Sequence, residues 1–426
     1  MKDKKTVCIL GAGIAGATVA HHLNQAGIEV CLLEKESEIG GRAIEMGCKA
    51  TDTCLRCNVC VANELLREVS ESPDINIYTQ TQLSKLSEGE NGSRYSAILK
   101  HKQSFINRSK CTNCKVCVEV CPEKCIKISG SGLFPTVPIL DYSKCLLSQG
   151  KKCSVCEDAC PVDAISMQDK DSESKMDFDS LVIATGYEPF NPKENSSFCS
   201  SKSSNVISGI EAEKQLAATG KITRPSDGSQ PKRVAFIQCV GSRSEEVYRK
   251  PEDTNYCSTV CCAYALRMSQ LIKYQNNEAE VTVFYMDIQK FGKGFEEFYK
   301  KCKKNMSFIR SRPYEITQDE DGSLNVKFAL KGDDSPVSEQ KFDLVVLSTG
   351  IRPSQSSIDI AEKLLVPVDE YGFIGFKNAS SLPDLQQDGI FAVGACESPK
   401  DMQSCMAQAE AVSAAVIKSL LGKNQT

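Results

Sequence analysis

The chain has 426 residues, a net charge of −4 from 51 basic and 55 acidic side chains, and 23 cysteines against three histidines. This length predicts two or three domains, and the balanced charge predicts no nucleic-acid partner. No apolar run reaches the length of a membrane span, so we expect no direct membrane insertion. Abundant cysteine in a long chain without a recognisable signal peptide predicts metal ligation in a reducing cytoplasm, where disulfides are rare.

Residues 6–34 have the pattern strand, tight turn, helix, strand. The turn has the form G-x-G-x-x-G, and Glu34 closes the second strand at the distance where a carboxylate holds a ribose. Glycines in this context allow the backbone to approach a pyrophosphate at the helix N-terminus. The residues expected at the dinucleotide are Gly11, Gly13, Ala15 and Gly16, with Glu34. The alternative is a plain packing turn.

The segment after Glu34, EKESEIGGRA, resembles the Glu-Lys…Gly-Gly-Arg segment of FAD-binding flavoproteins with two dinucleotide domains. Two later segments, LVIATGYEP and GIFAVGACE, resemble other parts of that FAD domain, although Ala395 stands where aspartate is usual. The resemblance implies FAD and assigns further contacts to Lys35, Gly41, Arg42, Thr185, Gly186, Gly394 and Ala395.

A cysteine-rich segment follows the first dinucleotide motif. Cys54, Cys57 and Cys60 have C-x2-C-x2-C spacing, and Cys48 precedes them. Thiolates at this spacing hold an iron–sulfur cluster or a zinc ion, and the alternative is a turn without metal. We expect a metal here, with iron–sulfur favoured by the motif that comes next.

Residues 110–161 contain two successive cysteine runs that each end in Cys-Pro. In a two-cluster ferredoxin, three cysteines of one run bind one cubane and the fourth binds the other. The expected sets are Cys111, Cys114, Cys117 with Cys160, and Cys145, Cys153, Cys156 with Cys121. A pair of zinc ribbons is the alternative, but the segment has no histidine.

A second dinucleotide-type unit is expected from residue 228, but its turn lacks the glycine signature. Cys239 occupies that turn, and the segment 255–274 is expected to be a helix that carries Cys257, Cys261 and Cys262. The alternative for the adjacent pair is small buried side chains. We expect the fold of an NAD(P)H domain in which cysteine chemistry replaces phosphate binding.

Five segments together resemble the A subunit of heterodisulfide reductase: GAGIAG…LLEKESEIGGRA, the twin ferredoxin run, FIQCVGSR…YCSTVCCAYAL, YMDIQKFGKGFEEFY and GIFAVGACESPKDM. In that family, residues that match Cys239, Cys257, Cys261 and Cys262 hold an unusually ligated cluster near the flavin. The resemblance predicts a short form without the C-terminal ferredoxin of longer members. Arg267 stands where the family often has lysine near the flavin, and Lys400 is a second near-flavin candidate.

The predicted fold class is α/β, a thioredoxin-reductase-like flavoprotein with two Rossmann-type domains and an inserted 2×[4Fe–4S] ferredoxin. The expected parts are 1–105, first FAD segment; 106–167, ferredoxin; 168–227, return to the FAD domain and linker; 228–350, degenerate NAD(P)H-like domain with a cluster site; 351–426, last FAD segment.

The predicted function is electron transfer within a larger soluble complex, between FAD and [4Fe–4S] clusters, with or without splitting of electron pairs. Expected partners are other redox subunits: heterodisulfide reductase B/C-like, hydrogenase- or dehydrogenase-linked, or of an aryl-CoA reductase type, with ferredoxin as a further candidate. The alternatives are a stand-alone NAD(P)H-dependent flavin oxidoreductase and an iron–sulfur redox sensor without turnover.

Overall fold

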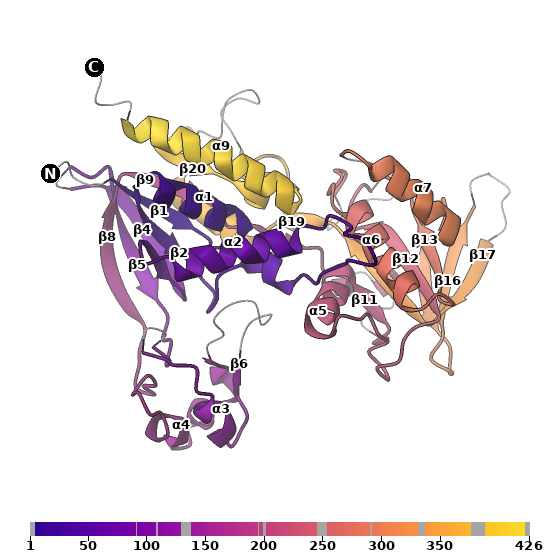
Figure 1. Ribbon diagram of the computed structural model, residues 1–426, viewed down its shortest axis with the longest axis horizontal. Coiled ribbons are helices and arrows are strands. Elements are labelled where there is room, and N and C mark those ends of the chain that lie inside the picture. The colour runs from indigo at the N-terminus through magenta and orange to yellow at the C-terminus, as the bar shows by residue number, and fades with distance from the viewer. Residues whose placement is uncertain are drawn as a thin grey trace.

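The structure is a computed structural model that describes residues 5–90, 92–107, 110–128, 138–194, 196–198, 202–244, 254–289, 292–330, 337–375 and 388–421. Figure 1 shows two α/β bodies side by side and a smaller lobe beneath the first. Within the described ranges, no helix is long and apolar enough to cross a membrane.

The first body is built on a parallel sheet with the strand order β20-β9-β1-β2-β3. Its strands are almost wholly apolar, as both faces of a parallel sheet are covered. The strands are β1 Thr6–Leu10, β2 Glu29–Leu33, β3 Ile75–Tyr78, β9 Ser180–Ile183 and β20 Ile390–Ala392. One face packs in a common core against the helices α1 Ile14–Gln25, α2 Val59–Glu71 and α9 Met402–Leu421.

The other face of this sheet is covered by an antiparallel sheet and one helix. The strands are β4 Thr81–Glu88, β5 Tyr95–His101 and β8 Ser172–Phe178, and the helix is α8 Gln355–Leu364. β5 and β8 pair along their whole length, from Tyr95 opposite Phe178 to His101 opposite Ser172. The lobe is therefore an insertion between two paired strands.

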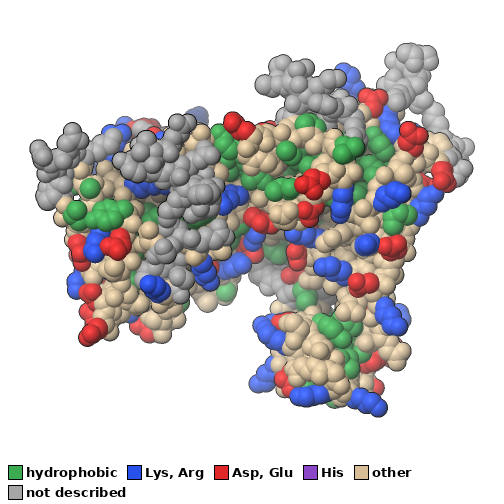
Figure 2. Space-filling model, turned by 180° about the vertical axis from the view of Figure 1, so that it is seen from behind, with side chains coloured by type: hydrophobic (Ala, Val, Ile, Leu, Met, Phe, Trp, Pro, Cys, Tyr) green, Lys and Arg blue, Asp and Glu red, His purple; other side chains and the backbone are tan. Residues whose placement is uncertain are grey.

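The lobe has a core of its own in which cysteines pack with apolar side chains. It contains α3 Val116–Val120, β6 Ile126–Ile128, β7 Pro138–Leu140 and α4 Val155–Asp158. Figure 2 shows the lobe standing clear of the rest of the molecule, with Lys and Arg side chains around its outer end.

The second body repeats the plan of the first. Its parallel sheet has the order β11-β18-β12-β13-β14, with α5, α6 and α7 in the core of one face and the antiparallel sheet β15-β16-β17 on the other. The strands are β11 Val206–Ser208, β12 Arg233–Val240, β13 Glu280–Phe284, β14 Ser307–Ile309, β15 Glu315–Gln318, β16 Leu324–Ala329, β17 Val337–Phe342 and β18 Leu344–Thr349. The helices are α5 Gly209–Thr219, α6 Cys261–Gln275 and α7 Phe295–Asn305.

The stretch assigned to a linker from the sequence, up to residue 227, supplies β11 and α5 to this second body. A capping box starts α5, in which Ser208 Oγ accepts from the Glu211 N–H and the Glu211 carboxylate accepts from the Ser208 N–H. The second body thus begins about one strand and one helix before the expected boundary.

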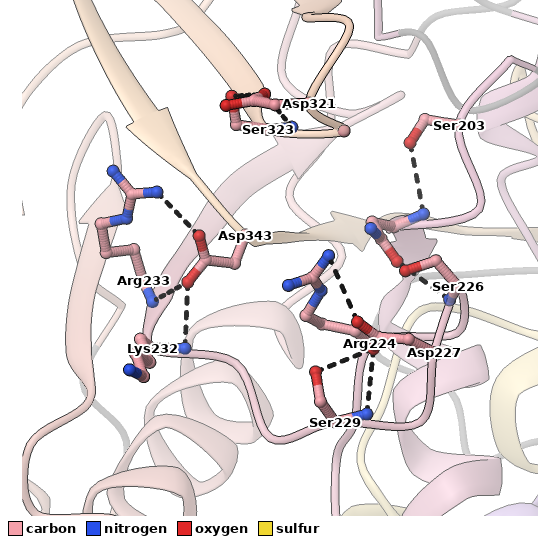
Figure 3. A network of polar contacts seen from close by, with 12 residues as sticks. Ser203, Arg224, Ser226, Asp227, Ser229, Lys232, Arg233, Asp321, Ser323 and Asp343 are labelled. Carbon is pink, nitrogen blue, oxygen red and sulfur yellow. Dashed lines mark hydrogen bonds and ion pairs between the residues drawn. The ribbon is translucent and has the colours of Figure 1, made fainter.

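The two sheets are anchored alike at the start of their central strands, β1 and β12. Asp343, just before β18, accepts from the backbone N–H groups of Lys232 and Arg233 at 3.1 and 2.9 Å and from the Arg233 guanidinium at 2.8 Å (Figure 3). Asp179, just before β9, accepts from the Thr6 N–H at 3.0 Å and from Lys5 Nζ at 2.7 Å.

Between the bodies, β10 Tyr187–Pro189 pairs antiparallel with β19 Ile351–Pro353. This ribbon marks the two crossings of the chain between the bodies. Short 3-10 turns complete the described structure: Gly41–Glu45, Tyr142–Lys144, Leu146–Gln149, Pro192–Glu194, Ser196–Phe198 and Gly394–Cys396.

Candidate functional site

The turn between β1 and α1 has the close packing that its glycines predict. A Cβ on Gly11, at φ +103°, would lie 2.4 Å from the Ala184 carbonyl oxygen, and one on Gly16 would lie 2.0 Å from that of Gly11. These two glycines therefore hold β1, α1 and the end of β9 in contact.

Gly13 has a different surrounding. It is the N-cap of α1, and apart from its chain neighbours no atom of the described residues lies within 4 Å of the position of its Cβ. The unpaired N–H groups of the first helical turn and the positive end of the helix dipole thus face open space, which suits a pyrophosphate. Gly41, at φ +52°, comes next to it, since its Cβ would lie 3.2 Å from Gly13 Cα.

Glu34 closes β2 beside this turn and is almost fully buried. Its carboxylate accepts from the Ala12 N–H at 2.9 Å and from the Glu36 N–H at 3.0 Å. Burial raises the pKa of Glu34, and the two backbone hydrogen bonds counteract part of that rise. The carboxylate is thereby fixed at the edge of the site, where a ribose would lie.

A groove of about 1000 Å³ starts at this turn. Of the expected flavin contacts it is lined by Gly11, Gly13, Ala15, Glu34, Lys35, Gly41, Arg42, Thr185, Gly186 and Ala395. Gly16 and Gly394 do not line it and have a packing role instead. A Cβ on Gly394 would lie 2.6 Å from that of Ala15, and its N–H donates to Gln408 Oε1 at 2.8 Å. Helix α9 thus supports the groove from behind.

The cysteine-rich segment 48–60 lies across the groove and contacts the second body at two points. Arg267 of α6 donates through Nε to the Leu55 carbonyl at 2.8 Å. Lys49 and Glu213 of α5 form an ion pair at 2.6 Å in which both side chains are less than a tenth exposed. Cys57 lines the groove, whereas Cys48, Cys54 and Cys60 are exposed.

Both near-flavin candidates, Arg267 and Lys400, line the groove. Burial lowers the pKa of Arg267, and the neighbouring Cys57 and Asp401 oppose that shift. Lys400 is paired with Glu397, so its ammonium is held in place by a carboxylate three residues earlier. The lining of the groove therefore includes two basic side chains that are held by contacts to neighbouring residues.

The end of β12 has the position of the glycine turn but a different backbone. Cys239 is buried within β12, where the strand register shifts, in a left-handed conformation at φ +60°, and Gly241 follows the strand at φ +69°. A Cβ on Gly241 would lie 2.2 Å from Phe190 Cγ, so this aromatic ring fills the side that is open at Gly13. The backbone at Gly241 therefore lacks the open side found at Gly13.

Cys257 does not lie on a helix, contrary to the sequence expectation. Thr259 has φ +61° and interrupts the segment, so α6 begins only at Cys261. The Cys257 sulfur accepts from the Thr259 N–H at 3.4 Å, within a loop in front of the helix. From a loop, the Cys257 thiol can be directed toward the start of α6. In a regular helix Cys257 and Cys261 would share one face, and Cys262 would be turned away from both.

The adjacent pair Cys261 and Cys262 diverges, as two successive helical residues must. Cys261 Sγ lies 3.5 Å from the Thr349 carbonyl and Cys262 Sγ lies 4.0 Å from that of Asp287. Burial raises the pKa of Cys261 well above its usual value, and the nearby thiols of Cys239, Cys262 and Cys257 raise it further. The four cysteines are therefore within electrostatic reach of one another.

The lobe groups its cysteines in the crossed pattern expected from the two runs. Burial raises the pKa of Cys117, and the nearby Cys111, Cys114 and Cys160 raise it further. A second group lines one cavity, namely Cys121, Cys125, Cys145, Cys153 and Cys156. Sequence reasoning missed Cys125 because it lies outside the ligand spacing.

The thiols of the second group line a cavity and do not converge on one point. In the described ranges no three His, Cys, Asp or Glu side chains are arranged as ligands of a single ion. A cubane takes one thiolate at each of four irons, so thiols distributed around a cavity fit its donor set. When bound, such clusters exchange single electrons.

Comparison with known proteins agrees with this geometry. Residues 9–46 match the family model of an NAD(P)-binding Rossmann-like domain, and residues 110–164 match that of a 4Fe-4S dicluster domain. The predicted cofactor classes, a dinucleotide at the Rossmann turn and [4Fe–4S] clusters in the lobe, are thereby confirmed.

Among solved structures, the chain resembles the thioredoxin reductases of T. acidophilum and Lactococcus lactis. The TM-scores are 0.54 and 0.52, at 13% and 14% identity, and each match covers 98% of this chain and 100% of the reductase. The molecule is thus a thioredoxin-reductase-like flavoprotein fold with an iron–sulfur insertion, which confirms the predicted fold class.

Curated relatives narrow this class. The A subunit of an H(2):CoB-CoM heterodisulfide,ferredoxin reductase from Methanothermobacter thermautotrophicus is 33% identical over 95% of this chain and 62% of its own length. An iron-sulfur A subunit of CoB--CoM heterodisulfide reductase from Methanopyrus kandleri is 35% identical over 97% and 64%. The chain thus spans less than two thirds of the length of these relatives. Over this shared region the chain resembles the A subunits of heterodisulfide reductase, which confirms the predicted resemblance.

Proposed function

We propose that the chain is an FAD- and [4Fe–4S]-containing electron-transfer subunit of a larger oxidoreductase complex. One observation carries this proposal. A single groove is lined by the glycine turn, by Cys57 of the cysteine-rich segment and by Thr259 and Val260 at the start of α6. A dinucleotide in this groove would have cysteine groups on its far side, where a flavoprotein reductase would have its nicotinamide domain.

The glycine turn, Glu34 and Arg42 would hold FAD. The side chains of Arg267 and Lys400 would balance negative charge on its ring. Flavin exchanges one or two electrons and clusters exchange one, so the pair converts between the two kinds of transfer. The chain's own part would be to hold the flavin in the groove with cysteine ligands nearby.

The assignment of ligands follows the grouping of the thiols. We assign one lobe cluster to Cys111, Cys114, Cys117 and Cys160 and the other to Cys121, Cys145, Cys153 and Cys156. A further cluster is assigned to Cys239 and Cys257 with at least one of Cys261 and Cys262. Cys48, Cys54, Cys57 and Cys60 are the candidates for another.

The lobe is the proposed route toward partners. Val120 on α3 and Val155 on α4 are 36% and 43% exposed and adjoin Cys121 and Cys156 in sequence, and Cys114 of the other cysteine group is exposed as well. Apolar side chains beside a redox centre suit docking of another redox subunit. The names of the relatives point to a complex of the heterodisulfide reductase type, and we propose partners of that class.

Anaerobically purified chain tests the proposal. We expect about one FAD per chain, and we expect the iron signals in low-temperature electron paramagnetic resonance (EPR) to appear when the flavin is photoreduced. NADH and NADPH should not bleach the flavin, since Phe190 fills the second turn. Absence of FAD would contradict the proposal and favour the iron–sulfur redox sensor. Rapid bleaching by either nucleotide would contradict it and favour a stand-alone flavin oxidoreductase.

A further inference from the structure

The second cavity of the lobe has one thiol more than a cubane uses. Five cysteine side chains line it, whereas a [4Fe–4S] cluster takes four thiolates. The additional one is Cys125, which is 2% exposed. Its sulfur lies 3.4 Å from that of Cys121, the only member of the ligand set contributed by the first cysteine run.

An internal comparison shows that this thiol is not required by the turn itself. The two runs end in CPEKCI and CPVDAI, so Cys125 corresponds to Ala164. The residues before them, Lys124 and Asp163, have the same left-handed backbone with φ +48°. Ala164 is also 2% exposed, so the position needs only a small buried side chain.

The hydrogen bonding of the two turns is also alike. The Ala164 N–H donates to Cys160 Sγ at 3.3 Å, and the Cys125 N–H likewise donates to the Cys121 sulfur. At this position the two turns therefore share a backbone conformation and a hydrogen bond and differ in the side chain. The first places a thiol beside its cluster cysteine, and the second places a methyl group there.

We propose that Cys125 is a second ligand for the iron that Cys121 binds, and that either thiolate can complete the cluster of Cys145, Cys153 and Cys156. In the exchange, the iron–sulfur bond to Cys121 breaks and one to Cys125 forms. The Cys125 proton passes to the released Cys121 sulfur, so no electron is gained or lost. This inference rests on the proposed dicluster function of the lobe.

Four variants of the full chain test it: Cys121→Ala, Cys125→Ala, the double variant, and Cys160→Ala. The readouts are iron per chain and the low-temperature EPR of the reduced protein. We expect Cys121→Ala to keep its iron with shifted EPR lines, because the substituted ligand changes the surroundings of the cluster. Cys125→Ala should keep its iron with the lines of the unmodified chain, and the double variant should lose one cubane, about four irons.

Cys160→Ala is the matched control, because Ala164 offers no substitute thiol. It should lose one cubane as a single variant. Cys160→Ala/Ala164→Cys should regain that iron, since the turn has the same backbone as the one that carries Cys125.

Loss of a cubane from Cys121→Ala as complete as that from Cys160→Ala would overturn the proposal. If Cys121→Ala does not fold, failure of Ala164→Cys to restore iron to the Cys160 variant has the same force. Absence of lobe iron from the unmodified chain would instead contradict the proposed function, so the two failures are distinguishable.

Discussion

The two Rossmann-type bodies differ at one turn while sharing their frame. Asp179 and Asp343 anchor equivalent strand starts, and each sheet is covered by helices on one face and by an antiparallel sheet on the other. At the turn after the central strand, Gly13 faces open space, whereas Gly241 faces the Phe190 ring. The comparison shows that the shared sheet frame does not by itself specify a cofactor. The difference between the two bodies lies in the turn at the end of β1 and of β12.

The difference has a physical basis in the backbone. The glycine turn offers N–H groups to an anion, which requires that no side chain intervene. At the end of β12, by contrast, Cys239 is the left-handed residue, and the Phe190 ring lies where a Cβ on Gly241 would be. The same frame therefore carries an open backbone turn in one body and a closed one beside buried cysteines in the other.

The largest effect is expected where the first turn is most crowded. Gly16→Ala would place a methyl group 2.0 Å from the Gly11 carbonyl oxygen, and the chain should lose roughly 3 kcal/mol or more of unfolding free energy. Denaturant unfolding measures this loss.

Gly13→Ala is its control, because no atom lies within 4 Å of the added methyl group. This variant should keep its stability within about 1 kcal/mol and lose FAD affinity at least tenfold, since the methyl group enters the phosphate space. If the Gly13 variant bound FAD as tightly as the unmodified chain, this turn would not be part of the dinucleotide site.

The second turn is tested by Cys257→Ala. We expect loss of one cluster, about four irons, with the lobe signals retained, because the Cys257 loop lies in front of α6 and apart from the lobe. Iron analysis and EPR measure the outcome. Cys302→Ala is the control: that thiol is fully buried in α7 and accepts from Gln270, so its loss should cost stability of about 1 kcal/mol and no iron. If both variants bound equal iron, Cys239, Cys257, Cys261 and Cys262 would be buried core residues and not cluster ligands.

The smallest effect concerns the shared frame. Burial acts to raise the pKa of Asp343, but the hydrogen bonds from Arg233 outweigh it and hold that pKa below its usual value. Asp343→Asn should therefore cost about 1 kcal/mol at neutral pH.

The sign of the pH dependence follows from the lowered pKa. The contribution of Asp343 is fully present above the unfolded value of about 3.9 and is lost as the pH falls through the lower folded value. Unfolding measured from pH 7 to pH 3 should show the two chains converging at the acid end. A constant difference across that range would mean that the carboxylate charge has no part in the anchor.

Much of this arrangement could be predicted from sequence, because its signals are local. Glycine spacing located the first turn, and the spacing with Cys-Pro endings located the lobe clusters. The start of α6 could not be predicted, since Thr259 adopts a left-handed conformation that its type rarely favours. β11 is three residues long, too short to show a period. The hydrogen bond from Arg267 to the Leu55 carbonyl joins positions far apart in the chain, so no local sequence pattern predicts it.

The place where the lobe enters the fold has a consequence for assembly. His101 and Ser172 are paired across neighbouring strands, so the host sheet already holds together the two ends of the inserted segment. Closing a loop of such length costs little beyond that of a shorter one, because the entropic cost grows only with the logarithm of length. The first body can therefore fold before iron is bound. Clusters can then be inserted into the lobe without unfolding the body that carries it.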